Sequence, residues 1–152
     1  MRVGLLVILV LLLLSSPSFG AELIGKVVSI LDGDTFEVLH NNHAERIRLS
    51  GIDCPEKGQA YGQKAKHAAS VLAFGKDVTI QTHGHDKYTR TIGDVILLDG
   101  SNVNHTLVRD GWCWWYRKYT PRDTMLEALE KEARESRKGL WADLHPVPPW
   151  EW

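Results

Sequence analysis

Alternation of apolar and polar residues with a period of two dominates residues 22 to 50. Successive side chains of a β-strand point to opposite faces, so this period is typical of strands with one buried face. Asp32-Gly33 and Asn41-Asn42 interrupt the alternation, and both pairs are typical of tight turns. The segment therefore predicts three consecutive antiparallel strands, two within residues 22–39 and one over residues 45–50.

The remainder of the chain changes between helix-like and strand-like periods. Apolar residues spaced three and four apart predict helices, and short apolar runs bounded by turn residues predict strands. These patterns place further elements at residues 58–74 (helix), 78–80 (strand), 92–98 (strand), 102–110 (helix) and 120–139 (helix). Five short strands with helices after the third and the fifth favour a five-stranded Greek-key barrel of the OB type with three helices, which is a mainly β fold of the α+β class.

The last helix and the tail after it carry particular signals. Thr120 is the predicted N-cap, with Pro121 at the first helical position, and Gly139 is the predicted stop. The tail, residues 142–152, follows Trp141 and is rich in proline and tryptophan. We expect it to lie on the surface without a regular element, and we expect the polar loop 82–91 to be exposed.

Residues 1–20 have the layout of a cleavable secretory signal, since Arg2 precedes an apolar run and a short polar segment follows it. An uncleaved membrane anchor is the alternative, although the apolar run is short for a span. Cleavage after Gly20 leaves 132 of the 152 residues, with 17 basic and 19 acidic side chains. We therefore expect a secreted or periplasmic protein with one domain at residues 21–141, whose charge attracts nucleic acid only at a local cluster.

Carboxylates gather at two corners of the predicted strands. Asp32 and Asp34 occupy the first turn, and Asp53 and Glu56 lie on a corner that Pro55 stiffens. Each corner alone is a weak signal, because aspartate is an ordinary turn residue. Together they offer oxygen ligands for a divalent cation and a carboxylate for activating a water.

Two arginines accompany these acids. Arg48 alternates with Ile47 and Leu49 on the third predicted strand, and Arg90 precedes the apolar run of the last strand. Either arginine alone could pair with a surface glutamate. Together they supply two planar guanidinium groups that suit the oxygens of one phosphate, so acids and arginines form a set fit for phosphodiester cleavage.

The order of these motifs resembles the staphylococcal nuclease (thermonuclease-like) family. The matching motifs are D-G-D-T at residues 32–35, R-x-R-L-x-G-I-D-C-P-E at 46–56, D-K-Y-T-R at 86–90, L-V-R-D-G-W at 107–112 and G-L-W at 139–141. The resemblance covers nearly all of residues 24–141. It implies an OB-fold barrel with three helices and a calcium-dependent phosphodiesterase that acts on DNA and RNA.

The resemblance also implies roles for single residues. Asp34 and Asp53 would ligate Ca²⁺ together with the backbone carbonyl of Cys54, and Glu56 would activate or position the attacking water. The groups that would contact substrate are Arg48 and Arg90 (phosphate and transition-state charge), Lys87 and Tyr88 (neighbouring phosphate or sugar), and Tyr116 and Tyr119 (base stacking). The aromatic patch at residues 112–119 is shifted and enlarged relative to the family, and its tryptophans are expected in the core.

Two departures from the family pattern fall at the site. Cys54 stands where the type member has threonine, which a backbone ligand tolerates. Thr89 replaces a glycine in the loop that presents Arg90. Cys54 and Cys113 lie 59 positions apart and could form a disulfide or remain two buried thiols, but they have no partners at zinc spacing.

Three readings of function stay open on the sequence alone. The first is the nuclease, a monomer without a stable protein partner. The second is a non-catalytic OB-fold module that binds oligonucleotide or peptide. Such a module would not need the full set of Asp34, Arg48, Asp53, Glu56 and Arg90. The third is a calcium-stabilised surface protein, which would not need the arginines. His83 and His85 are expected to be loop residues rather than metal ligands.

Overall fold

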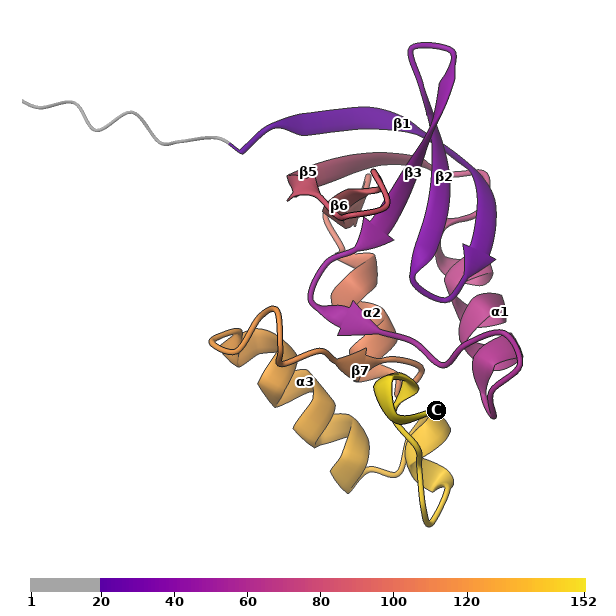
Figure 1. Cartoon of the computed structure of the whole chain (residues 1–152), viewed down its shortest axis with the longest axis vertical. Helices are drawn as coiled ribbons and strands as arrows, with labels where there is room; N and C mark the ends of the chain where they lie inside the picture. Colours follow the sequence, from indigo (N-terminus) through magenta and orange to yellow (C-terminus); the bar gives the residue numbers. More distant parts are fainter. Residues whose placement is uncertain (1–19) are drawn as a thin grey trace, which may run out of the picture.

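A closed five-stranded barrel forms the body of the protein in the computed structural model, which describes residues 20–152 (Figure 1). The strands follow the order β1-β2-β3-β6-β5 around the barrel. Their bounds are β1 Glu22–Asp32, β2 Thr35–His40, β3 His43–Leu49, β5 Asp77–His85 and β6 Thr91–Leu97. A separate two-stranded sheet joins β4 (Ile52–Asp53) to β7 (Trp114–Trp115). The predicted OB-type barrel is confirmed.

The alternation of the sequence sets which side chains enter the barrel. Phe36 of β2 pairs with Ile47 of β3, and both are fully buried. The next pair, Glu37 and Arg46, forms an ion pair of 3.0 Å on the outer face. β3 then pairs in parallel with β6, which closes the barrel and sets Arg48 opposite the segment that follows Arg90.

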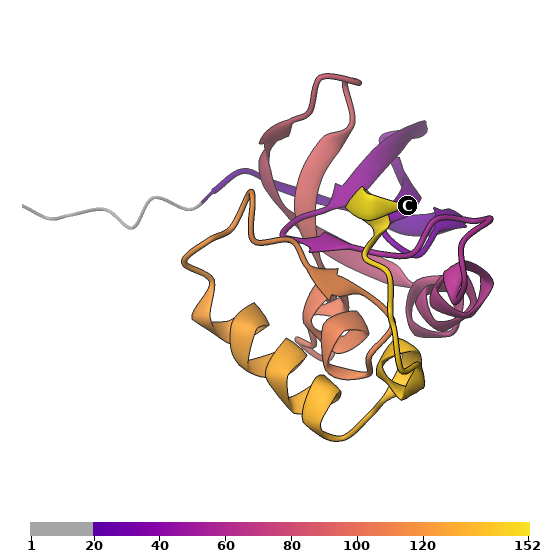
Figure 2. The same cartoon turned by 60° about the horizontal axis from the view of Figure 1, so that its bottom comes forward.

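Three helices cover one end of the barrel: α1 (Gly62–Ala73), α2 (Val103–Arg109) and α3 (Thr124–Glu135). α1 packs on β1, and α2 lies between the barrel and α3 in both views (Figures 1 and 2). Leu107 and Val108 of α2 and Leu126 of α3 are buried in the same core as the barrel side chains. The predicted number and order of helices are confirmed.

The first helix begins later than predicted, at Gly62 rather than near residue 58. Residues 56–59 form a hydrogen-bonded turn, and Tyr61 has a left-handed φ of 68°, so the helix cannot begin before Gly62. Gly62 approaches the carbonyl of Glu56 so closely that a Cβ would collide with it. This contact requires glycine and fixes the turn that carries Glu56 against the start of α1.

The predicted cap of the last helix is wrong. Asp123, not Thr120, is the N-cap, since its Oδ1 accepts a hydrogen bond of 2.9 Å from the backbone N–H of Leu126. The Thr120 hydroxyl instead accepts one of 3.1 Å from the Trp115 indole N–H. The predicted loop 82–91 is also shorter than expected, because β5 continues to His85, although this strand end is exposed.

Cys54 and Cys113 form a disulfide, which settles the alternative that the sequence left open. Both residues are buried in the main core. The bridge joins Cys54, directly after β4, to Cys113, directly before the strand β7 that pairs with β4. The second acidic corner is therefore held covalently to a segment 59 positions away.

The C-terminal tail folds back over the β4 and β7 sheet, as Figure 2 shows. It lies on the surface as predicted, but it is not without regular elements, because Pro149–Glu151 form a turn of 3-10 helix after the one at Gly139–Ala142. Pro149 is buried, and Trp150 packs against Trp114 at 5.6 Å between ring centres. Packing of these aromatic rings therefore orders a segment whose proline-rich composition predicts no regular secondary structure.

The predicted signal segment, residues 1–20, lies outside the described residues except for Gly20. The division into a domain at 21–141 and a tail at 142–152 stays a prediction. None of the helices within residues 20–152 is long and apolar enough to cross a membrane.

Replacing both cysteines with alanine should destabilise the fold. A crosslink that closes a loop of this length stabilises a protein by about 4 kcal/mol through the entropy of the unfolded chain. Urea unfolding of the Cys54→Ala/Cys113→Ala variant should show a loss of about 2 to 4 kcal/mol in the free energy of unfolding. Oxidised wild-type protein is the reference, and wild-type protein whose disulfide has been reduced should show a similar loss. An unchanged free energy in both samples would contradict the structural role of the bridge.

Candidate active site

Asp34 anchors the first acidic corner to the second. It lies between β1 and β2 and is only 6% exposed. Its Oδ2 accepts a hydrogen bond of 2.6 Å from the backbone N–H of Cys54, and its Oδ1 accepts one of 3.3 Å from the Thr35 hydroxyl. Gly33 packs on the Cys54 side chain with no room for a Cβ. The two corners that the sequence separates by about 20 positions are thus one structural unit.

Arg48 connects this unit to the barrel. Its Nη1 donates hydrogen bonds of 2.9 Å to the carbonyls of Leu49 and Ile52, which fix the direction of the side chain. Its Nη2 donates one of 2.9 Å to Asp53 Oδ1 and lies 3.4 Å from Asp34 Oδ2. Arg48 therefore contacts both acidic corners with one nitrogen.

Carboxylates outnumber the guanidinium at this junction. Burial lowers the pKa of Arg48, but the charges of Asp34, Asp53, Asp32 and Glu56 outweigh it and raise that pKa. Burial raises the pKa of Asp34 and of Asp53, and Arg48 offsets part of each rise. Burial and the neighbouring charge of Asp34 raise the pKa of Asp32 to about 6. The site holds an excess of negative charge that one arginine does not balance.

Arg90 is held by an acid of its own loop. Its Nε donates a hydrogen bond of 2.6 Å to Asp86 Oδ2, and Asp86 Oδ1 accepts from the backbone N–H groups of Tyr88 and Arg90. Slight burial opposes ionisation of Asp86, but these bonds outweigh it and lower its pKa. Thr89 has a left-handed φ of 63°, so the position where the family has glycine keeps a glycine-like backbone.

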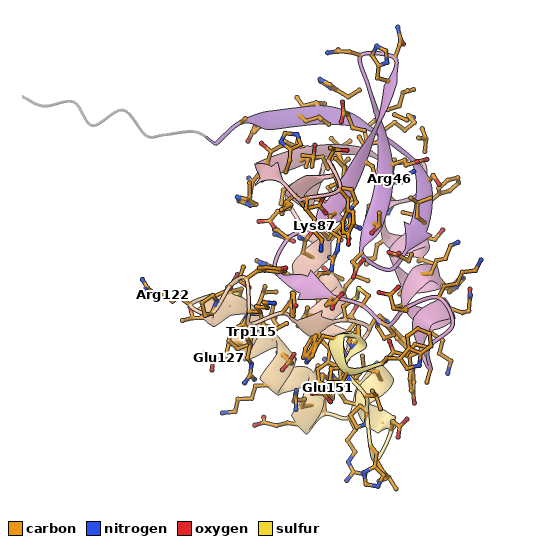
Figure 3. The ribbon with its side chains drawn as sticks, in the orientation of Figure 1. Arg46, Lys87, Trp115, Arg122, Glu127 and Glu151 are labelled. Atoms are coloured by element: carbon orange, nitrogen blue, oxygen red, sulfur yellow. A yellow bond between two sulfur atoms is a disulfide. The ribbon has the colours of Figure 1, made fainter. Side chains whose placement is uncertain are left out.

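One pocket of about 840 Å³ collects the predicted substrate contacts. Its wall includes all six of them: Arg48, Arg90, Lys87, Tyr88, Tyr116 and Tyr119. Within residues 20–152, the acids of the two corners lie behind Arg48 rather than in this wall. Figure 3 shows Lys87 on the barrel side and Trp115 on the side of α3. The arginines therefore face a common space between the barrel and the last helix.

Comparison with known proteins identifies the family of the chain. Residues 46–143 match the family described as staphylococcal nuclease homologue. The chain belongs to the staphylococcal nuclease family.

Two bacterial relatives span nearly the whole chain. A protein of Escherichia coli O157:H7 called an uncharacterized endonuclease is 46% identical over 144 residues, which are 95% of this chain and 94% of the relative. A micrococcal nuclease of Shigella flexneri is 41% identical over 152 aligned positions, which cover 94% of this chain and 87% of the relative. A staphylococcal-like nuclease of Arabidopsis thaliana is 40% identical over 107 residues, 70% of this chain and 32% of that protein. The predicted family and the prediction of a phosphodiester hydrolase are confirmed.

The chemistry of the acidic corners in this nuclease fits a hard cation. Asp34 and Asp53 supply carboxylate oxygens, and burial leaves their charge poorly solvated. Within the described part of the chain, no three acidic, cysteine or histidine side chains converge on a point where they alone would enclose a metal. A cation here would therefore need backbone oxygen and several waters, which Ca²⁺ accepts.

Glu56 lies at the open side of this corner. It is exposed, and its backbone N–H donates a hydrogen bond of 3.1 Å to Gln59 Oε1. Its charge reaches both Arg48 and Asp53, since it raises the pKa of each. A carboxylate that is accessible to water and next to the other site groups is suited to hold a nucleophile.

The aromatic residues divide between core and pocket. Trp114 and Trp115 of the patch are buried, which confirms their expected core role, and Trp112 is half-buried against the core. Trp141 is buried as well. Tyr116 and Tyr119 line the pocket with their rings edge to face at 4.8 Å.

Sequence reasoning missed Asp86 and Gln59 as supports of the site residues. Asp86 has a local signal, because an aspartate two and four residues before Tyr88 and Arg90 is placed to accept from both backbone N–H groups. Gln59 has no local signal, since its second contact lies 88 positions away.

Replacing Asp86 with alanine should impair catalysis by releasing Arg90. Loss of orientation of a charged group commonly costs about tenfold in rate, so kcat/KM of Asp86→Ala should fall about tenfold. Asp86→Asn keeps an acceptor for the two backbone N–H groups and should lose less. Asp99→Ala is the matched control, because Asp99 accepts similar bonds from Ser101 in an exposed turn outside the pocket. Equal kcat/KM for Asp86→Ala and Asp99→Ala would contradict this role.

Proposed function

We propose that this chain is a secreted or periplasmic, calcium-dependent nuclease that hydrolyses phosphodiester bonds of DNA and RNA with little sequence specificity. The observation that carries the proposal is the double contact of Arg48, which binds both acidic corners and lines the same pocket as Arg90. A phosphate in that pocket would meet two guanidinium groups beside an acidic cluster. This combination serves phosphodiester cleavage better than it serves simple binding.

Asp34, Asp53 and the backbone carbonyl of Cys54 are the residues that would hold the cation. All three supply hard oxygen ligands, and the excess negative charge at the corners favours a divalent ion. When bound, calcium would screen the negative charge of the phosphate. The disulfide at Cys54 supports this role, because it restrains the backbone that carries the third ligand.

Glu56 is proposed to take a proton from the attacking water or to orient that water. Its exposure gives water access, and its position beside Arg48 and Asp53 places it at the edge of the cluster. General base catalysis by a positioned carboxylate contributes about 10²- to 10⁴-fold in rate. Glu56 is the one carboxylate of the cluster that is exposed rather than buried or half-buried.

Arg48 and Arg90 are proposed to bind the phosphate and to stabilise the charge that develops on it. Both guanidinium groups are already oriented by bonds within the protein, so little reorganisation is needed when substrate binds. Their side chains are 17% and 27% exposed, which shields them from solvent more than ordinary surface arginines. A preorganised pair of this kind stabilises a transition state more than a flexible pair.

Breadth of substrate follows from the remaining pocket residues. Lys87 and Tyr88 are exposed beside Arg90 and would contact a neighbouring phosphate or sugar. Tyr119, which is 71% exposed, and Tyr116 offer rings on which a base could stack. Stacking tolerates any base, and phosphate contacts carry no sequence information, so we propose that both DNA and RNA are cleaved.

Export is supported by two features. The predicted signal segment opens the chain, and the disulfide between buried cysteines suits an oxidising compartment such as the periplasm or the cell exterior.

Glu56→Gln should lower turnover while leaving substrate affinity nearly unchanged. In calcium, kcat on plasmid DNA and on RNA should fall at least about 100-fold, because the amide cannot accept a proton, whereas KM should change little. Steady-state kinetics of the mature protein on both substrates measures the two constants. Chelation of calcium should abolish activity in the wild-type protein.

Lys57→Gln is the matched control, since Lys57 is the exposed neighbour of Glu56 and has no assigned role. Its kinetics should match those of the wild type. Unchanged turnover in Glu56→Gln would remove Glu56 from the chemistry. Degradation that persists in excess chelator would contradict the dependence on a divalent cation.

A further inference from the structure

The C-terminal tail contacts the turn that carries Glu56. The side chain of Gln59 is almost wholly buried and makes a hydrogen bond at each end. Its Oε1 accepts from the backbone N–H of Glu56 at 3.1 Å, and its Nε2 donates to the carbonyl of Val147 at 2.7 Å. One amide thus links Glu56 to a residue of the tail.

The same tail contacts the wall of the pocket. Trp150 stacks on Tyr116 with ring centres 5.1 Å apart and planes 26° from parallel, and Tyr116 lines the pocket. The Trp150 ring also meets Trp114 edge to face at 5.6 Å. At the end of the chain, the Trp152 ring lies against Gly58 in the turn after Glu56. The tail therefore contacts the segments that follow both β4 and β7, and Figure 2 shows it running along this sheet.

Glu56 depends on its backbone for its position. Within residues 20–152, its carboxylate forms no hydrogen bond or ion pair with another residue, in contrast to Asp34 and Asp53. An exposed carboxylate with a free side chain is oriented only as well as the main chain that carries it. The turn at residues 56–59 and the close contact with Gly62 restrain that main chain locally. The Gln59 side chain adds a further bond to the Glu56 N–H, and its long-range bond to Val147 ties this turn to the tail.

We propose that residues 144–152, here called the C-terminal strap, position Glu56 and Tyr116 for catalysis. Gln59 and Trp150 are the positioning residues, and neither touches the reacting groups. The proposal rests on the proposed function for the role of Glu56. Displacement of a catalytic group by about 1 Å can cost about 100-fold in rate, so a restraint of this kind has a measurable effect on turnover.

Gln59→Met tests the link to Glu56. Methionine is close to glutamine in shape but makes neither hydrogen bond, so the packing is kept while the restraint is lost. We expect kcat to fall about 10- to 100-fold with KM within about twofold of the wild type. Gln63→Met is the matched control, because Gln63 is exposed and donates only a 3.3 Å bond to the carbonyl of Lys57. All rates are measured well below the melting temperature of each variant.

Trp150→Ala tests the strap itself, with Trp150→Phe as the conservative variant. The alanine variant should raise KM several-fold through Tyr116, and the phenylalanine variant should restore most of the wild-type value because it keeps a stacking ring. Hydrogen exchange at the Glu56 backbone amide is the readout that needs no activity. It should speed up at least about tenfold in both Gln59→Met and Trp150→Ala, although Trp150 does not contact Glu56.

The two proposals fail in different ways. A wild-type protein that degrades neither DNA nor RNA overturns the proposed function. Even then, slow hydrogen exchange at the Glu56 amide in the wild type and fast exchange in both variants would support the role of the strap in holding Glu56. Unchanged exchange at Glu56 in both variants overturns the strap even if the enzyme is active. Faster exchange with unchanged kcat in an active enzyme overturns the claim that the strap serves catalysis.

Discussion

Arg48 holds the functional end of this molecule together, because a single guanidinium contacts both acidic corners and the pocket. Two backbone carbonyls orient it, and Asp34 and Asp53 share one of its nitrogens. A buried charge without its partner is costly, so removal of Arg48 would leave the acids repelling one another in a poorly solvated space. These contacts still leave the site with a net negative charge, and a net negative charge favours the binding of a divalent cation.

The barrel brings these groups together from distant parts of the chain. Parallel pairing of β3 with β6 places the loop of Arg90 beside Arg48, and the disulfide pins the corner of Asp53 to β7. The tail then packs over the same sheet and reaches Glu56 through Gln59. Rigidity at the site thus comes from several independent long-range links, whereas the groups that meet substrate remain at the surface of one pocket.

Local patterns predict the strands, the helices and the family well. Alternation and turn residues place the strands, and the spacing of acids and arginines indicates the chemistry, since both depend on neighbours in the chain. Contacts between distant segments carry no such signal. The disulfide between Cys54 and Cys113 depends on how the barrel closes, and so does the hydrogen bond from Gln59 to Val147. The predicted N-cap is wrong because Thr120 and Asp123 are both good caps, and the Thr120 hydroxyl accepts a hydrogen bond from the Trp115 indole N–H instead.

The most direct test of the account is a crystal structure of the mature protein with Ca²⁺ and a non-hydrolysable dinucleotide. The account predicts one calcium ion bound by Asp34, Asp53 and the Cys54 carbonyl, and one phosphate within hydrogen-bond distance of both Arg48 and Arg90. A phosphate that contacts neither arginine, or a calcium ion bound away from the two aspartates, would contradict the central claim that these groups form a single catalytic site.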